Sequence, residues 1–302
     1  MTFTTQIKEE ITKEENNNIE DLTSLCTYLK FNATLEEDKM TVMVVNASVA
    51  RWIFKLLKTN YNVLIKLTTR TMKRFKARNL YILEVKEKLD LIYKDIDNIF
   101  KEINTSSDEE KKAFLKGMFL ACGSINDPKK NQYHLEFLVK EEEDAKLIDD
   151  LLNSLKIKSK VLKRDREYMV YVKSSENISD FIKYLGAFNA LFYFEDIRIY
   201  KDHKNMVNRL NNCEQANVER TLKSSKIILN NIKYLEDNDL LMLLDERSKE
   251  IIEYKKKYPD TSLGELAEII TMETNKSITK SGINHHFRKI NALVKKAKEN
   301  HE

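Results

Sequence analysis

The stretch Leu115-Lys-Gly-Met-Phe-Leu-Ala-Cys-Gly123 decides the fold, because it joins an apolar helix to small residues at its third, seventh and ninth positions. It closes a helix predicted over 108–121, which Ser107 and Glu110 open with the spacing of a capping box. A turn at 126–129 and a strand over 134–139 follow. Since small residues let two backbones approach closely, the stretch predicts a helix that packs against a second helix.

The same order of elements occurs earlier in the chain. We predict a helix over 20–30, a hairpin over 31–45, a helix carrying Val49, Ile53, Leu56 and Leu57, and strands over 63–67 and 81–85. The later counterparts are a helix carrying Ala145, Ile148, Leu151, Leu152 and Leu155, and strands over 161–162 and 168–172. The sequence therefore predicts an α+β fold with two tandem α-β-β-α-β-β repeats, 1–104 and 105–194, paired helix against helix.

Composition narrows the class of protein. Hydrophobic residues make up 42% and charged residues 33%, which suits packed cores rather than a disordered chain. The net charge of +4 is too small by itself to indicate nucleic-acid binding. No apolar window is long enough to span a membrane, and the polar first residues do not resemble a secretory signal. We therefore expect a cytoplasmic protein without a membrane partner.

Cysteine use argues against a metal or cofactor site. Cys26, Cys122 and Cys213 lie far apart, and no Cys or His pair has zinc-ligand spacing. We expect buried or half-buried thiols in a reducing cytoplasm, and neither a metal nor a cofactor.

A polar, helical segment over 195–235 follows the two repeats. We interpret it as a connector, and its basic side chains include Arg209. Contact with a polyanion and a solvated helix face are both consistent with this charge pattern, and charge alone favours the solvated face.

The last segment, 236–302, is predicted to be all-α. A helix over 245–258 stops at Pro259, and the capping box of Ser262 and Glu265 opens a short helix that runs through Ile270. A turn-rich stretch over 272–277 precedes a final helix over 279–298. In this final helix the apolar residues Ile283, Phe287, Ile290 and Val294 form one buried stripe.

A short helix, a turn and a longer basic helix make the helix-turn-helix plan, whose second helix enters the major groove of DNA. The candidate DNA-contacting residues are Lys280, Ser281, Asn284, His285, Arg288 and Lys289. Arg pairs with guanine and Asn pairs with adenine. A three-helix bundle with a solvated basic face is the plain alternative. Neighbouring His285 and His286 point in different directions on a helix, which argues against a metal pair.

These residues carry a family resemblance. Residues 115–123 resemble the LAGLIDADG motif of homing endonucleases, and residues 22–30 resemble a weaker copy with Ser24 at the small position. The motif, its place before a hairpin in both repeats, and the segments at 133–137, 186–191, 208–217 and 281–285 together resemble the WhiA family of bacterial regulators. The resemblance implies a LAGLIDADG-type domain joined to a helix-turn-helix, and a role in sporulation and cell division.

The positions that would hold a catalytic metal lack acids. In the nucleases that the motif resembles, the Asp before each closing Gly binds a divalent cation, which prefers carboxylate oxygens. On this alignment the matching positions are Leu29 and Cys122, and Asp127 lies beyond the helix in a turn. We therefore expect no nuclease and no enzyme. For Cys122 a core position is favoured over a redox sensor.

Basic loops recur at one place in both repeats. The candidate DNA-contacting residues there are Arg70, Lys73, Arg74, Lys76 and Arg78 in the first repeat, and Lys163, Arg164 and Arg166 in the second. A phosphate-tracking saddle and soluble hairpin tips explain the pattern equally well.

Together these features predict a sequence-specific transcriptional regulator that binds double-stranded DNA at the nucleoid. It would be linked to cell division and chromosome organisation and, where present, sporulation. No small-molecule substrate is expected. The alternative is a nucleoid-associated or division-machinery adaptor that acts mainly through another regulatory protein.

Overall fold

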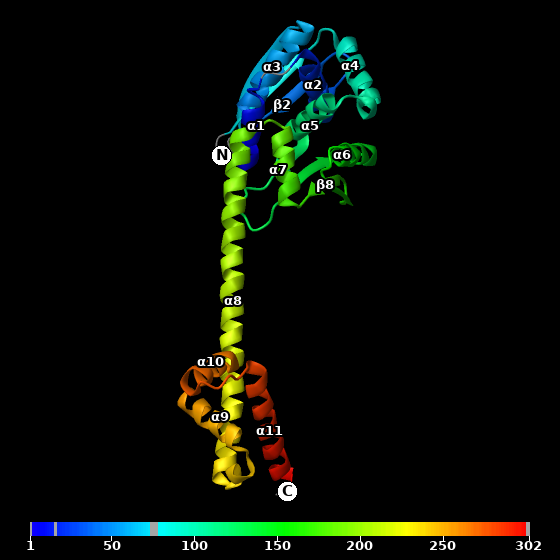
Figure 1. Ribbon diagram of the computed structural model, residues 1–302. Helices are drawn as coiled ribbons and strands as arrows, with labels where there is room; N and C mark the ends of the chain where they lie inside the picture. The colour runs from blue at the N-terminus through cyan, green and yellow to red at the C-terminus, as the bar shows by residue number, and fades with distance from the viewer. Residues whose placement is uncertain (1, 15–16, 73–77, 300–302) are drawn as a thin grey trace. The chain divides into compact units, whose positions relative to one another are not determined.

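The computed structural model describes residues 2–14, 17–72 and 78–299, and they form two compact units that meet in sequence at Asp202 and His203. The first unit holds both predicted repeats and the second holds the C-terminal helices (Figure 1).

Each repeat has the predicted α-β-β-α-β-β order. The first consists of α2 (Asn18–Asn32), β1 (Ala33–Leu35), β2 (Met40–Val44), α3 (Ala47–Tyr61), β3 (Ile65–Met72) and β4 (Arg78–Val85). The second consists of α5 (Asp108–Cys122), β5 (Gly123–Ile125), β6 (Leu135–Val139), α6 (Glu142–Ser154), β7 (Lys160–Lys163) and β8 (Tyr168–Val172). Both sheets are antiparallel, with the orders β1-β2-β4-β3 and β5-β6-β8-β7. The matching orders confirm the tandem repeat.

Helices α2 and α5 pack closely, as the small residues predicted. A Cβ atom added to Gly117 would lie 2.3 Å from the Ser24 carbonyl oxygen and 2.8 Å from Thr27 Cβ. The capping box of Ser107 and Glu110 that opens α5 is present. The helix seam between the repeats therefore depends on a residue without a side chain at position 117.

The structure corrects the alignment of the first motif. Helix α2 continues to Asn32 and gives way to β1 at Ala33, just as α5 ends at Cys122 and gives way to β5 at Gly123. Asn32, rather than Leu29, is thus the counterpart of Cys122. Leu29 is fully buried in the core. The sequence alignment began at Leu22, and the helix places the equivalent motif three residues later.

Three helices of the first unit complete the core. Helix α1 (Phe3–Ile11), which the sequence analysis did not predict, buries Phe3, Ile7 and Ile11, and Thr4 Oγ1 donates to the Ile125 carbonyl at 2.8 Å. Helix α4 (Leu89–Glu102) with the short η1 (Ile103–Thr105) leads into α5, and α7 (Ser175–Tyr184) follows the second sheet. The N-terminal segment is therefore part of the folded unit.

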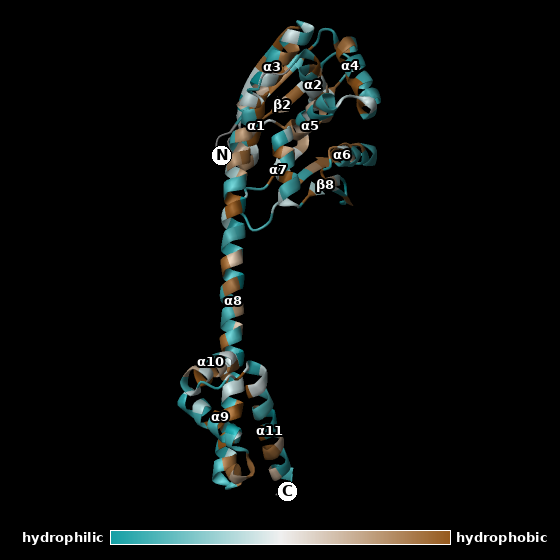
Figure 2. Cartoon of the chain, viewed as in Figure 1, coloured by the Kyte–Doolittle hydropathy of each residue, from teal (hydrophilic) through white to brown (hydrophobic). Residues whose placement is uncertain are grey.

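The second unit is all-α. It contains η2 (Leu240–Leu243), α9 (Glu246–Lys257), α10 (Leu263–Thr274) and α11 (Lys280–Glu299), together with the last part of α8 (Phe188–Asp237). Apolar positions recur along these helices (Figure 2). Ile228, Ile232 and Leu235 of α8 belong to the core of this unit. Residues 195–235 are therefore shared between the two units and do not form a separate connector.

Two further expectations can be compared with the described residues. No helix among them is long and apolar enough to cross a membrane. Cys26 is buried and Cys122 is partly buried, as expected, but Cys213 is exposed on α8. The expectation of a sheltered thiol was wrong for Cys213.

Candidate nucleic-acid interface

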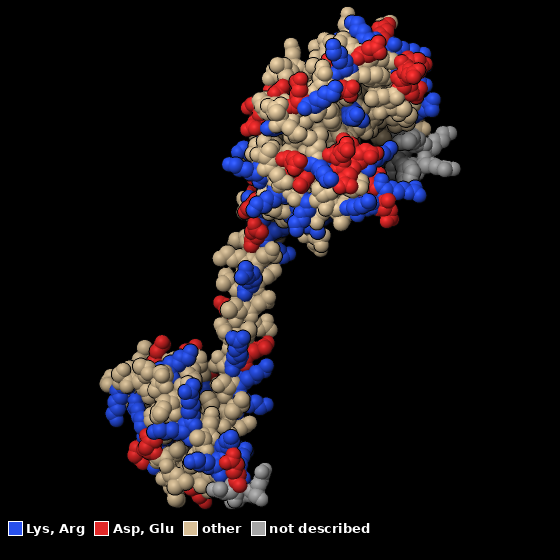
Figure 3. Space-filling model, turned by 90° about the vertical axis from the view of Figure 1, so that its right-hand side faces the viewer, with Lys and Arg blue, Asp and Glu red and all other residues tan. Residues whose placement is uncertain are grey.

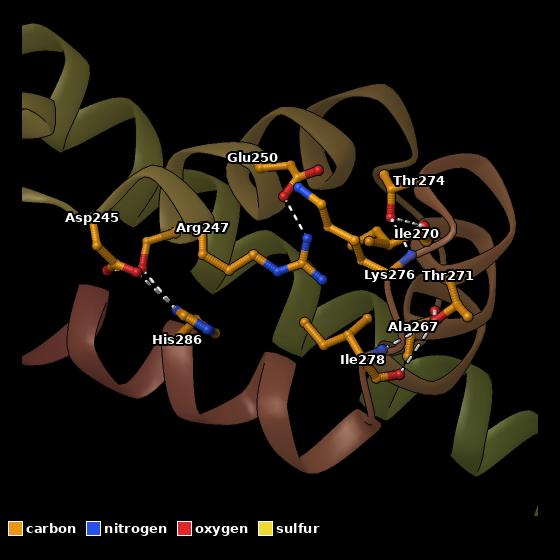
Figure 4. Close-up of polar contacts among 11 residues, drawn as sticks. Asp245, Arg247, Glu250, Ala267, Ile270, Thr271, Thr274, Lys276, Ile278 and His286 are labelled. Atoms are coloured by element: carbon orange, nitrogen blue, oxygen red, sulfur yellow. Dashed lines mark hydrogen bonds and ion pairs between the residues drawn. The ribbon is translucent and has the colours of Figure 1, made fainter.

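A tight turn joins α10 to α11. Asn275 ends α10 in the left-handed conformation, with φ at 55°, which Asn tolerates better than most residues. Thr274 Oγ1 donates to the Ile270 carbonyl at 2.7 Å and accepts from the Lys276 backbone N–H at 3.3 Å (Figure 4). Because α10 continues to Thr274, the turn is shorter than the sequence predicted.

Threonine hydroxyls fix where α11 begins. Thr271 Oγ1 donates to the Ala267 carbonyl at 2.8 Å and accepts from the Ile278 backbone N–H at 3.2 Å (Figure 4). Thr279 Oγ1 accepts from the Gly282 backbone N–H at 3.1 Å, which satisfies a free donor at the start of the helix. The capping box of Ser262 and Glu265 that opens α10 is also present. These bonds define the path from α10 into α11.

The inner face of α11 is the predicted apolar stripe. Ile283, Phe287, Ile290 and Val294 are all buried in the core of the second unit. Each fully buried apolar side chain of this size contributes about 1.5–3 kcal/mol to stability. The stripe therefore fixes which face of α11 points outward.

The outer face of α11 carries the predicted DNA-contacting residues. Lys280, Ser281, His285, Arg288 and Lys289 are exposed and Asn284 is half-buried. Among the described residues, none makes an ion pair with Lys280, Arg288 or Lys289. One face of the unit shows Lys and Arg spread over it, with acids among them (Figure 3). The six residues therefore lie within the first three turns of α11, and the exposed Lys280, Arg288 and Lys289 are accessible to a ligand.

His286 has a positioning role that the sequence analysis did not predict. Its Nδ1 lies 2.8 Å from Ser248 Oγ and 4.0 Å from an Asp245 carboxylate oxygen at the start of α9 (Figure 4). Burial is the main reason that its pKa lies below the ordinary value, and Asp245 opposes this shift. His285 is exposed, so the two rings meet different surroundings.

Lys255 ties α9 to its neighbours from inside the unit. The side chain is fully buried, and its Nζ donates to Ser225 Oγ of α8 at 2.9 Å and to the Thr261 carbonyl at 2.7 Å. Burial lowers the pKa of this ammonium. Two hydrogen bonds of a buried ammonium therefore anchor the segment before α10.

The basic loops of the sheets are only partly described. Arg70 is exposed on β3, Lys73, Arg74 and Lys76 lie outside the described residues, and so does the side chain of Arg78, whose backbone begins β4. In the second repeat Lys163 Nζ lies 5.5 Å from the centre of the Tyr168 ring, and Arg164 and Arg166 are exposed in the following turn. The described cations therefore lie on two different sheets.

Not all of the sheet surface is basic. Lys66 on β3 forms an ion pair with Glu84 on β4 at 3.2 Å, so this pair offers no excess charge to a phosphate. Arg209 is exposed on the part of α8 that belongs to the second unit. Part of the sheet surface is therefore neutralised by ion pairing, whereas Lys280, Arg288 and Lys289 of α11 make no ion pair with the described residues.

The two positions equivalent to the motif's metal-binding Asp, Asn32 and Cys122, hold poor ligands for a hard cation. Burial raises the pKa of the Cys122 thiol to about 12, so the sulfur is protonated at neutral pH. The Asn32 side-chain amide donates to the Tyr28 hydroxyl, and an amide oxygen carries no net charge. Asp127 Oδ1 accepts from the Lys129 backbone N–H at 2.9 Å, which makes it a turn residue as predicted. Neither equivalent position therefore supplies a carboxylate.

Fold and site together define a class of protein: two LAGLIDADG-like repeats followed by a helix-turn-helix unit. Three family models match the chain in this order. They are the WhiA N-terminal LAGLIDADG-like domain over 19–99, the WhiA LAGLIDADG-like domain over 111–204 and the WhiA C-terminal HTH domain over 207–294.

Full-length relatives agree with these models. The chain is 36% identical to the probable cell division protein WhiA of Oceanobacillus iheyensis, over 99% of this chain and 98% of that protein. It is 38% identical to the protein of the same description in Bacillus cytotoxicus, over 98% and 97%. The crystal structure of full-length WhiA from Thermotoga maritima matches in fold, with a TM-score of 0.60, 21% identity and coverage of 98% and 99%. The chain belongs to the WhiA family.

Proposed function

We propose that this protein is a sequence-specific DNA-binding transcriptional regulator. The observation that carries the proposal is the outer face of α11, where exposed polar and basic side chains stand on a helix fixed by its buried stripe. The major groove accepts one α-helix, and side chains near its N-terminal end reach the base edges.

We assign different roles to the side chains of this face. Arg288 would bind a guanine and Asn284 an adenine, each through two hydrogen bonds. Lys280 and Lys289 would contact phosphates, which adds affinity without sequence preference. Ser281 and His285 lie on the same exposed turns and complete the surface.

Fluorescence anisotropy of the full chain on a preferred duplex and on random DNA tests this proposal. Arg288→Ala and Asn284→Ala should each weaken binding to the preferred duplex by about five- to 150-fold, and change binding to random DNA much less. Lys296→Ala, an exposed position near the end of α11, is the matched control and should reduce both affinities modestly. Equal losses on both duplexes would refute base recognition.

We further propose that the protein does not cleave the DNA it binds. Asn32 and Cys122 are the side chains that replace the paired acids, and neither is a carboxylate. Incubation of the full chain with supercoiled plasmid and Mg²⁺ should leave the plasmid intact. Nicked or linear product that disappears with EDTA would refute this part of the proposal.

The biological process is proposed from the relatives. They are described as probable cell division proteins, and we propose that this chain acts at the nucleoid in the control of cell division and chromosome organisation, and in sporulation where the organism sporulates. Depletion of the protein should alter division timing. Chromatin immunoprecipitation should recover discrete sites that are lost in the Arg288→Ala variant.

A protein adaptor is the second candidate, because the first repeat has an apolar groove. Leu67 on the edge strand β3 is 52% exposed and lines this groove of about 230 Å³ with Phe54 and Tyr81. Pull-downs that compare the full chain with its Leu67→Glu variant would test it. Partners retained equally by both proteins would exclude this groove.

A further inference from the structure

Lys116 is a buried charge without a hydrogen bond. It is the second residue of the motif on α5, and its side chain is only 6% exposed. Among the described residues its Nζ finds no hydrogen-bond partner, although the ammonium has three hydrogens to donate. Buried polar groups are normally paired, so this one requires an explanation.

The nearest acid only partly compensates this charge. Glu14 Oε2 lies 3.8 Å from Lys116 Nζ, which is an ion pair but too long for a hydrogen bond. Burial is the main cause that lowers the pKa of Lys116 and raises the pKa of Glu14, and the Glu14 side chain remains 32% exposed. The pair does not account for the three donors of the ammonium.

Lys116 lines a cleft that is built from both repeats. The cleft has a volume of about 240 Å³, below the roughly 300–1,000 Å³ of sites for drug-sized molecules. Its lining comes from α2, α5, the end of α7, the turn after α7, and Glu14, and it includes Glu20, Ser24, Lys112, Lys183 and Gly186. A small ligand would therefore contact elements of both repeats and the segment that leads into α8.

Gly186 lets the Glu14 carboxylate lie directly against the backbone at one wall of the cleft. Gly186 has a positive φ of 76°, and a Cβ atom there would lie 2.2 Å from a Glu14 carboxylate oxygen. Lys112 Nζ lies 5.3 Å from the centre of the Tyr184 ring, which holds a second cation at the lining. Lys183 is the third cation at the lining of the cleft.

We propose that this cleft binds a small oxyanion, a carboxylate or phosphate group, through Lys116. An anionic oxygen would accept the hydrogen bonds that Lys116 cannot make within the protein, and Lys112 and Lys183 would add attraction. Glu14 carries the same sign of charge as the ligand and opposes binding. Because Glu20 and Glu109 also line the cleft, a ligand with a single negative charge should bind more tightly than one with two.

Thermal unfolding of the full chain in sodium phosphate, sodium acetate and sodium chloride at matched ionic strength tests the proposal. At least one of the two oxyanions should raise the melting temperature of the first unit in a saturable way, and chloride should not. Isothermal titration calorimetry would then give the dissociation constant of the active ion.

Two variants with opposite expected effects separate a binding site from general stabilisation. Lys116→Met, which keeps the length of the side chain, should weaken oxyanion binding at least about tenfold, which is the loss of about one charge-assisted hydrogen bond. Glu14→Gln should strengthen it, because a competing negative charge is removed. Lys111→Met on the same helix is the control and should bind like the parent chain.

Each outcome bears on the proposal. Saturable binding that Lys116→Met loses and Glu14→Gln gains would support it. An identical response to all three salts would overturn it, and so would an oxyanion response that Lys116→Met retains. If Lys116→Met fails to fold, the Glu14→Gln variant decides: affinity that stays unchanged or falls would contradict the assigned geometry.

Discussion

Gly117→Ala tests the helix seam of the first unit. An added Cβ atom would lie 2.3 Å from the Ser24 carbonyl oxygen and 2.8 Å from Thr27 Cβ, so backbone must move to admit it. Overpacking of a core costs about 1–3 kcal/mol, and the upper end applies because no flexible side chain can give way. Alanine recovers about 1 kcal/mol of helix propensity. We therefore expect a net loss of about 2 kcal/mol in the free energy of unfolding.

The only tryptophan makes this loss measurable. Trp52 is 5% exposed on α3, and its ring meets that of Tyr28 on α2 at 5.9 Å, so its fluorescence reports on the first unit. A loss of about 2 kcal/mol should lower the urea midpoint by about 1 M. Gly264→Ala is the matched control, because its nearest atom, Ser262 Oγ, is 3.8 Å away and it lies in the second unit. An unchanged Trp52 midpoint in Gly117→Ala would refute the close approach of α2 and α5.

Three more changes test the second unit, each followed by far-UV circular dichroism during thermal unfolding. The pKa of His286 is lowered below its ordinary value of about 6.5, so the folded state favours the neutral ring. The contribution of His286 to stability is therefore present above pH 6.5 and is lost as the pH falls from 6.5 towards the folded pKa. His286→Gln should flatten this pH dependence, and an unchanged profile would contradict the assignment. Lys255→Met leaves Ser225 Oγ and the Thr261 carbonyl without their donor and should cost about 1–3 kcal/mol. An equal or higher melting temperature would show that these two hydrogen bonds do not outweigh the desolvation of the ammonium. Thr271→Val keeps the shape of the side chain but removes the acceptor of the Ile278 N–H, so the free energy of unfolding should fall by about 1–2 kcal/mol. Thr274→Val should cost less, because the Lys276 N–H that it leaves unpaired is on an exposed residue. A larger loss for Thr274→Val than for Thr271→Val would contradict the turn described.

Local patterns predicted the second unit well because its elements are fixed by near neighbours. The stripe from Ile283 to Val294 follows helical spacing, and the capping box at Ser262 needs only residues within one turn. His286 was different. Its partner Ser248 comes from another helix, and no spacing in the sequence links the two.

The first unit shows where sequence patterns are ambiguous. Leu22 and Leu25 are both suitable leading residues for the motif, and only the end of α2 at Asn32 decides between them. Helix α1 could have been found, because Phe3, Ile7 and Ile11 recur at the spacing of a helix face, but its polar neighbours hid the pattern.

Asn32 and Cys122, where the LAGLIDADG motif carries an Asp, place no carboxylate at the helix seam. Two carboxylates at a helix seam would repel each other, and a bound cation or a shared proton would be needed to offset that repulsion. Asn32 and Cys122 remove that repulsion, since the amide is neutral and the raised pKa of the thiol keeps it protonated. The seam can then be stabilised by packing alone, with Gly117 permitting the contact. Lys116 is the buried charge of this helix pair, and it is the place where the oxyanion that we propose would act on the seam.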